Sequence, residues 1–131
     1  MEVSSKNPWH DFTIWQITQL LTSYCTLFNI ESSPGQKPGS DIIVKRKDNN
    51  NVVNVEVQMH PSGKEFEATV KKWWNRHQRA KSTCIVCPTA LRSTMMNRVF
   101  KIEPRFIKES IFFFGDDQIE QLCATIFSIL G

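Results

Sequence analysis

Alternation of apolar and polar residues is clearest in the first half of the chain, where two short runs rich in Val and Ile flank a polar turn. The runs cover residues 40–44 and 53–59, and the Asn/Asp cluster 48–51 lies between them. Two such runs joined by turn-forming residues predict a β-hairpin. The Pro-, Gly- and Ser-rich stretch 32–39 predicts a loop that leads directly into the first run.

Side chains alternate between the two faces of a strand, so the sequence itself assigns residues to each face of the hairpin. In the second run the valines share one face, and Glu56 and Gln58 share the other. In the first run Asp41 lies on the face opposite Ile42 and Val44. The carboxylates of Asp41 and Glu56 can therefore converge, and because unpaired buried charge is costly, we expect a divalent cation between them.

Helical spacing of apolar residues appears on both sides of the hairpin. Apolar residues three and four apart predict an amphipathic helix from about His10 to Asn29, and the same spacing predicts a second helix from about Lys64 to Lys81. The second helix also carries many basic residues beside an exposed Trp. This combination grips phosphates and stacks on bases in nucleic-acid-binding proteins, although a solvated helix surface produces the same charge pattern. The candidate nucleic-acid-binding residues are Lys37 in the preceding loop and Lys64, Lys71, Lys72, Trp74, Arg76 and Arg79.

The second half of the chain continues with alternating strands and helices. Residues 82–87 predict a buried strand, 91–100 a short helix, 111–114 a strand buried on both sides, and the last residues a helix. The expected order is α-β-β-α-β-α-β-α, in a single domain over residues 1–131. Strands separated by helices predict an α/β fold, with a central mixed β-sheet flanked by helices on both faces.

Composition narrows the possibilities only slightly. The chain has 131 residues, with 16 Lys and Arg against 13 Asp and Glu, and a net charge of +3 that is compatible with nucleic acid. An apolar content of 40% excludes a disordered chain. The first residues lack the apolar core of a signal peptide and no apolar run is long enough to cross a bilayer, so we expect an intracellular, cytoplasmic protein without membrane contact.

The pair Cys84 and Cys87 has the spacing of a redox or zinc motif. In a strand, however, these two positions point to opposite faces, and no second ligand pair accompanies them. We therefore expect plain buried thiols.

The combination of Asp41, a hairpin, Glu56-Val57-Gln58, a basic helix and a further strand resembles the PD-(D/E)xK nuclease superfamily. The small archaeal and viral Holliday junction resolvases are the members that it resembles most. The resemblance implies a restriction-endonuclease-like fold and a metal-dependent DNA endonuclease. Asp41 matches the metal-binding Asp of the family, and Glu56 matches the acidic position on the next strand.

Three positions depart from the family pattern. Gln58 stands where the family usually has Lys, and Gln orients a water or a phosphate oxygen without supplying positive charge. Some family members recruit a Lys from the following helix, a part that Lys72 or its neighbour Lys71 can play here, while Lys64 is nearer in sequence. For the acid in the first helix the chain offers Asp11, with Gln16 and Gln19 in the middle of that helix, and Ser40 replaces the Pro of the motif.

By this resemblance, Mg²⁺ or Mn²⁺ is held by Asp41, Glu56 and the backbone carbonyl of Val57, since Mg²⁺ prefers oxygen ligands. The ion lowers the pKa of a bound water for attack on the phosphodiester. The implied partners are DNA, including branched DNA, and a second copy in a two-fold dimer. Two alternatives stay open: a nuclease fold without catalysis that binds DNA or a protein partner, and a small interaction protein with no nucleic-acid role.

Overall fold

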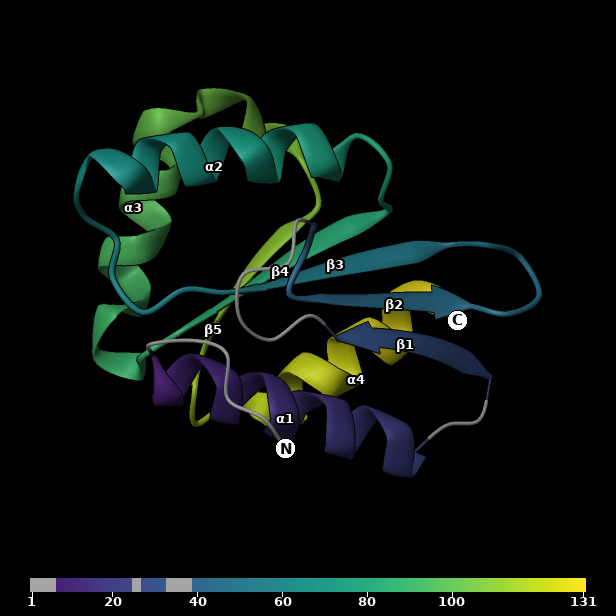
Figure 1. Cartoon of the computed structure of the whole chain (residues 1–131). Coiled ribbons are helices and arrows are strands. Elements are labelled where there is room, and N and C mark those ends of the chain that lie inside the picture. Colours follow the sequence, from purple (N-terminus) through teal and green to yellow (C-terminus); the bar gives the residue numbers. More distant parts are fainter. Residues whose placement is uncertain (1–6, 25–26, 33–38) are drawn as a thin grey trace.

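The computed structural model describes residues 7–24, 27–32 and 39–131, and in this part of the chain five strands form one mixed sheet (Figure 1). The sheet order follows the chain, from β1 to β5. β1, β2 and β3 pair in antiparallel fashion, whereas β3, β4 and β5 are parallel. The mixed sheet predicted from the sequence is thus confirmed. The strands are β1 (Phe28–Ser32), β2 (Ile42–Arg46), β3 (Val52–Val57), β4 (Ser82–Cys87) and β5 (Ile111–Gly115).

Helices cover both faces of the sheet, as the alternating strands and helices predicted (Figure 1). α1 and α4 pack on one face, and α2 and α3 pack on the other. None of the helices within the described ranges combines the length and the apolar character that a bilayer-spanning segment requires. The helices are α1 (Pro8–Tyr24), α2 (Lys64–His77), α3 (Arg92–Ile102) and α4 (Ile119–Leu130), and 3₁₀ turns cover Thr89–Leu91 and Pro104–Lys108.

The predicted order of elements is wrong between α1 and β2, because it lacks the strand β1. The first helix was expected to continue to Asn29, but α1 ends at Tyr24, and Phe28 begins a strand that pairs with β2. Phe28 is buried and its ring stacks on Phe127 of α4, with 5.4 Å between the ring centroids. Strand pairing and this ring contact outweigh a helical spacing that happens to continue past the end of α1.

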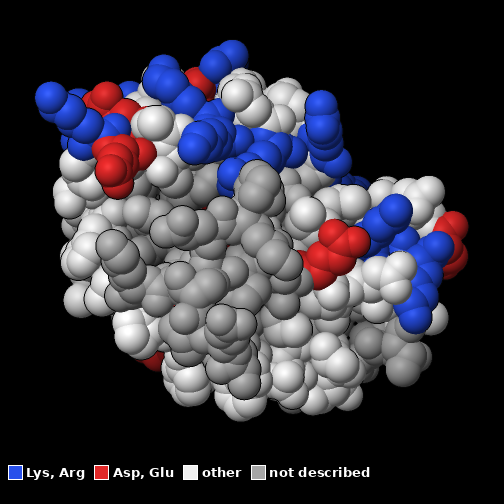
Figure 2. Space-filling view, viewed as in Figure 1, with Lys and Arg blue, Asp and Glu red and all other residues white. Residues whose placement is uncertain are grey.

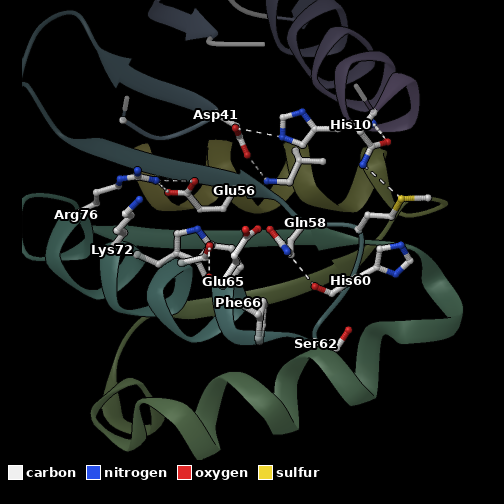
Figure 3. Close-up of a pocket in the computed structure, with 16 residues that line it drawn as sticks. His10, Asp41, Glu56, Gln58, His60, Ser62, Glu65, Phe66, Lys72 and Arg76 are labelled. Atoms are coloured by element: carbon white, nitrogen blue, oxygen red, sulfur yellow. Dashed lines mark hydrogen bonds and ion pairs between the residues drawn. The ribbon is translucent and has the colours of Figure 1, made fainter. Parts of the chain in front are cut away.

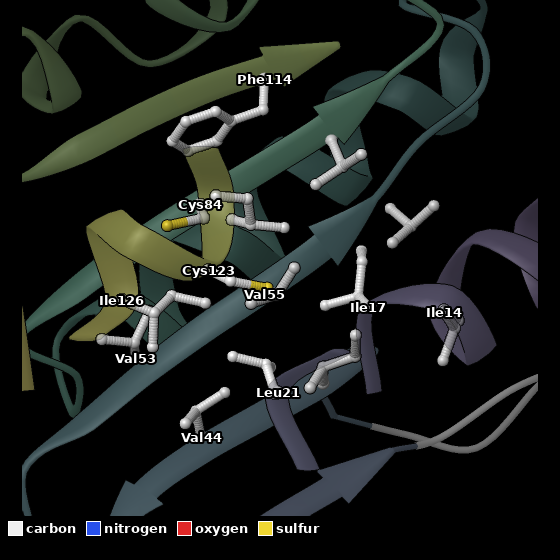
Figure 4. Close-up of a cluster of buried hydrophobic side chains, with 14 of the residues drawn as sticks. Ile14, Ile17, Leu21, Val44, Val53, Val55, Cys84, Phe114, Cys123 and Ile126 are labelled. Carbon is white, nitrogen blue, oxygen red and sulfur yellow. The ribbon is translucent and has the colours of Figure 1, made fainter. Parts of the chain in front are cut away.

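The larger apolar layer lies between the sheet and the helices α1 and α4 (Figure 4). Val53 and Val55 of β3 pack there against Leu21 of α1 and Ile126 of α4. The valines of the second run therefore share one buried face, as their alternation predicted.

The cysteines of the fourth strand point to opposite sides of the sheet. Cys84 belongs to the layer under α1 and α4, and Cys87 belongs to the layer under α2 and α3. Burial raises the pKa of Cys84 to about 12 and the pKa of Cys87 to about 11, so both remain protonated thiols. The prediction of plain buried thiols is confirmed for this pair.

The second apolar layer covers only half of its face of the sheet. Phe66 and Trp73 of α2 and Val99 of α3 pack on Ile85 of β4 and Phe113 of β5. No residue of β1, β2 or β3 among those described belongs to this cluster. On this face the hairpin meets α2 through polar side chains instead, because the buried Asn54 and Glu56 both contact Arg76.

β5 lies at the edge of the sheet but is buried on both faces, as expected, because Phe113 belongs to the layer under α2 and α3 and Phe114 to the layer under α1 and α4. Phe113 and Phe114 are buried, but Phe112 is 37% exposed. The apolar pattern of 111–114 does not report that this strand has only one neighbour in the sheet.

Candidate active site

Asp41 and Glu56 open into a pocket of about 490 Å³ between the hairpin and α2 (Figure 3). Asp41 immediately precedes β2, and Glu56 lies within β3. Ile42 pairs with Val55, so the same antiparallel register, continued by one residue, places Asp41 opposite Glu56. Residues opposite each other in a sheet project from the same face, as the alternation in the sequence predicted.

Both carboxylate oxygens of Asp41 have partners. The backbone N–H of Val57 donates a hydrogen bond to Oδ2 with an N···O distance of 2.7 Å. The Nε2 atom of His10, in the first turns of α1, lies 3.3 Å from Oδ1. These two contacts hold the carboxylate at the mouth of the pocket, where its side chain remains 19% exposed.

Glu56 is much more deeply buried, at 2% exposure, and it faces Arg76 of α2. The Nη1 atom of Arg76 lies 3.3 Å from Oε1 and 3.4 Å from Oε2. A single nitrogen shared between two oxygens at these lengths is weaker than the parallel, bidentate arrangement that Arg and carboxylate can form. Arg76 therefore offsets negative charge on Glu56 but does not hold its carboxylate in a bidentate ion pair.

The buried position changes the protonation of Glu56. Burial, followed by the negative charge of Asp41, raises the pKa of Glu56 to about 7. The Ser40 hydroxyl, the Arg76 guanidinium and the backbone amide of Asp41 act in the opposite direction. Two neighbouring carboxylates, one of them with a strongly raised pKa, are typical of a functional site.

His10 belongs to the site, although the sequence did not single it out. Its Nδ1 atom lies 3.4 Å from Oδ1 of Asp11, while its Nε2 faces Asp41. Burial lowers the pKa of His10, but the hydrogen bonds and charges of Asp41 and Asp11 outweigh this effect, so that the pKa is raised above 6.5. The sequence offered one indication of this role: His10 directly precedes Asp11, which was the candidate for the acid in the first helix.

Asp11 itself does not line the pocket. It is 3% exposed and reaches the site only through His10. Gln16 and Gln19 line a different surface groove, together with Trp15. A further carboxylate at the rim, Glu65 at the start of α2, was not anticipated from the sequence.

The pocket offers two carboxylate side chains, Asp41 and Glu56, as ligands for a divalent cation that prefers oxygen. Within 7–24, 27–32 and 39–131, no three His, Cys, Asp or Glu side chains are grouped so as to hold a metal ion. Mg²⁺, however, often binds through one or two carboxylates and retains several waters. Asp41 and Glu56 meet this requirement, and a bound cation would take over the charge balance that His10 and Arg76 provide.

The residues expected to act beside the carboxylates occupy the same pocket. Val57, Gln58 and Lys72 all line it. Val57 contributes its backbone N–H through the bond to Asp41, and coordination by its carbonyl stays a prediction. The Gln58 side chain donates a hydrogen bond from Nε2 to the carbonyl of His60 at 2.9 Å, so its amide is turned along the pocket wall.

The candidate nucleic-acid-binding residues divide into two groups. Lys and Arg gather over α2 (Figure 2). From this helix and the residues after it, Lys72 and Arg76 line the pocket and Arg79 lines an adjoining cavity. Lys64 and Lys71 are exposed but do not line the pocket, and Lys37 lies outside the described residues.

Trp74 lies on the other side of α2, toward the residues that follow α3. The guanidinium carbon of Arg105 lies 4.5 Å from the centroid of the Trp74 ring, and the ring of Phe106 meets Trp74 edge-on with centroids 5.1 Å apart. The structure does not bring Trp74 to the pocket.

Comparison with known proteins adds no family assignment to this geometry. No protein-family model, no curated protein and no solved structure matches the chain.

Proposed function

We propose that the chain is a metal-dependent endonuclease that hydrolyses phosphodiester bonds in DNA. The observation that carries the proposal is the register of β2 and β3, which sets Asp41 opposite Glu56 at a pocket shared with the basic residues Lys72 and Arg76. Carboxylates for a cation and cations for a phosphate are the two charge sets that phosphodiester hydrolysis needs at one place.

Each residue then has a defined part. Asp41 and Glu56 would hold Mg²⁺ or Mn²⁺, which supplies an activated water and neutralises charge on the phosphate. Lys72 and Arg76 bind the phosphate oxygens, and these contacts position the backbone without reading its sequence. Gln58 orients a water or a phosphate oxygen through its amide. The Val57 amide and His10 fix the orientation of Asp41.

The order of elements supports a restriction-endonuclease-like fold within this proposal. The acids lie on an antiparallel hairpin, which is followed by α2 and the parallel strand β4. Such a hairpin–helix–strand unit is the arrangement that the resemblance implies. Branched DNA as the substrate and a homodimer as the assembly stay predictions.

A nuclease fold that binds DNA without cutting it is the second candidate. Two contacts favour it: Gln58 is bonded to the carbonyl of His60, and Arg76 lies against the carboxylate of Glu56. If Arg76 remains paired with Glu56 when DNA binds, a metal ion cannot be coordinated by both Asp41 and Glu56.

Cleavage assays separate the two candidates. The purified full chain is incubated with an end-labelled four-way junction, linear duplex and single strand, with Mg²⁺, Mn²⁺ or chelator. The nuclease proposal predicts metal-dependent cutting that Asp41→Asn and Glu56→Gln abolish. Glu120→Gln is the matched control, because it removes an exposed carboxylate of α4 that does not line the pocket.

The outcomes are distinct. Salt-sensitive DNA binding without cutting by the wild type selects the second candidate, since phosphate contacts release counterions. Cutting that survives both Asp41→Asn and Glu56→Gln contradicts the assignment of the site.

A further inference from the structure

A second cavity, of about 450 Å³, adjoins the pocket of Asp41 and Glu56 and shares Gly39 and Arg76 with it. It lies beside α2, over residues of β2 and β3 that do not belong to the second apolar layer. Its volume is within the range of roughly 300–1,000 Å³ typical of small-ligand sites. Gly39 and Arg76 thus lie between the acids and this second cavity.

The cavity combines an apolar floor with polar groups. Ile43 of β2 and Val52 of β3 are half-buried and line it. Asn54, which pairs with Ile43 across the hairpin, donates a hydrogen bond from Nδ2 to the backbone carbonyl of Arg76 at 3.2 Å. Asn75 is exposed on α2 and carries both a donor and an acceptor. A flat, apolar ring with a hydrogen-bonding edge matches this lining.

Among the described residues, two arginines and no acidic residue line the cavity. Arg76 and Arg79 are three residues apart near the end of α2, and both line the cavity. In the part of the chain that the structure describes, the Arg79 side chain forms no ion pair. Its guanidinium is therefore available for an anion, and phosphate is the anion that a planar guanidinium binds through two parallel hydrogen bonds.

We propose that this cavity binds an unpaired base of the DNA strand, next to the phosphate that lies at Asp41 and Glu56, with Arg79 on the adjacent phosphate. The inference rests on the proposed function and specifies its substrate class. A base inside a duplex must leave the stack before it enters a pocket, and this costs least where the base is already unpaired. The substrate is therefore DNA with an unpaired nucleotide at the cut, as at a flap, a single strand or a branch point.

Binding of short probes tests the pocket without any cleavage. The thymidine dinucleotide with a 5′-phosphate, and its two analogues with an abasic sugar at either position, are titrated into the full chain in chelator, and the amide and methyl resonances are followed by NMR. We expect one of the two abasic analogues to bind about tenfold more weakly than the parent dinucleotide. The shifted resonances should include those of Ile43, Val52 and Asn75.

Matched variants test whether the difference in affinity between the parent dinucleotide and the abasic analogue arises in this cavity. Asn75→Trp fills the cavity from an exposed helix position and should abolish the difference between the parent and the abasic probe. Gln78→Trp adds the same ring at an exposed position that does not line the cavity, and it should retain the difference. Arg79→Gln should weaken all three probes alike, because it removes a phosphate contact. Val52→Phe, which narrows the cavity from the sheet, repeats the test if Asn75→Trp fails to fold.

Equal binding of all three probes by the wild type overturns the proposed base pocket, and so does discrimination that survives in both cavity-filling variants. Failure of the proposed function gives a different result. In that case the probes still discriminate, but no DNA is cut with Mg²⁺ or Mn²⁺. If DNA is cut and continuous duplex is cut as fast as the same sequence with one unpaired nucleotide, only the base pocket is contradicted.

Discussion

Asp41 and Glu56 each face a basic side chain from another part of the chain. His10 of α1 faces Asp41, and Arg76 of α2 faces Glu56. Both contacts are longer than a strong charge-assisted hydrogen bond, and the short bond on Asp41 comes from the backbone amide of Val57. The proposed function requires that a metal ion replace His10 and Arg76 beside these two carboxylates.

The raised pKa of Glu56 predicts how stability depends on pH. Its value of about 7 in the folded state lies above the ordinary value of 4.5, so the folded protein binds more protons through this group than the unfolded chain. The stability that Glu56 contributes is full below the ordinary pKa and is lost as the pH rises to about 7. Glu56→Gln should therefore gain stability relative to the wild type across this window, by on the order of 3 kcal/mol.

Urea unfolding in chelator, at several pH values through this window, measures the difference. Glu120→Gln is the control, and its difference from the wild type should not follow the same curve. A constant difference between Glu56→Gln and the wild type contradicts the assignment of a protonated, buried Glu56.

At the scale of elements, α2 has two tasks. Its apolar side closes the second core layer through Phe66, Val70 and Trp73, and its other side brings Lys72 and Arg76 to the pocket. Phe66 lies at the start of the helix, is 1% exposed and meets Trp73 edge-on with ring centroids 5.9 Å apart. The position of the basic residues therefore depends on the packing of this helix.

Phe66→Ala should destabilise the fold by about 3–5 kcal/mol, because it removes a buried ring and leaves a cavity. Ile107→Ala removes an apolar side chain that is 63% exposed, and it should change the free energy of unfolding by no more than about 0.5 kcal/mol. Urea denaturation of the two variants measures both values. A Phe66→Ala effect as small as that of Ile107→Ala would contradict the role of this ring as the anchor of α2.

The sequence pattern predicted those elements whose identity depends on residues close together in the chain. Alternation along 53–57 gave the two faces of β3 correctly, and with them the side on which Glu56 projects. β1 was missed because its identity depends on pairing with β2, which lies beyond a loop. His10 and Arg76 were not recognised as partners of the acids for the same reason. His10 precedes Asp41 by a whole helix and strand, and Arg76 follows Glu56 by most of α2, and no spacing in the sequence encodes such contacts.

At the scale of the whole molecule, the unequal coverage of the sheet makes the site possible. α1 and α4 bury one face along β2, β3 and β4 in the larger apolar layer. On the other face the apolar cluster reaches only β4 and β5, and α2 meets β3 through polar contacts with Asn54 and Glu56. This polar half carries Asp41, Glu56 and the adjoining cavity, and Lys72 and Arg76 of α2 line it with positive charge. The fold thus places the acids, Arg76 and the adjoining cavity next to one another on one face of the sheet.

The shared cation between Asp41 and Glu56 is the central claim, and Mn²⁺ binding to the DNA-free protein tests it most directly. Titration calorimetry, with the free ion followed in parallel by electron paramagnetic resonance, gives the stoichiometry and the affinity. The wild type and Glu120→Gln should bind a single ion, and Asp41→Asn and Glu56→Gln should each weaken it by at least about tenfold. Binding that is equally tight in all four proteins, or no binding by the wild type, would contradict the shared site.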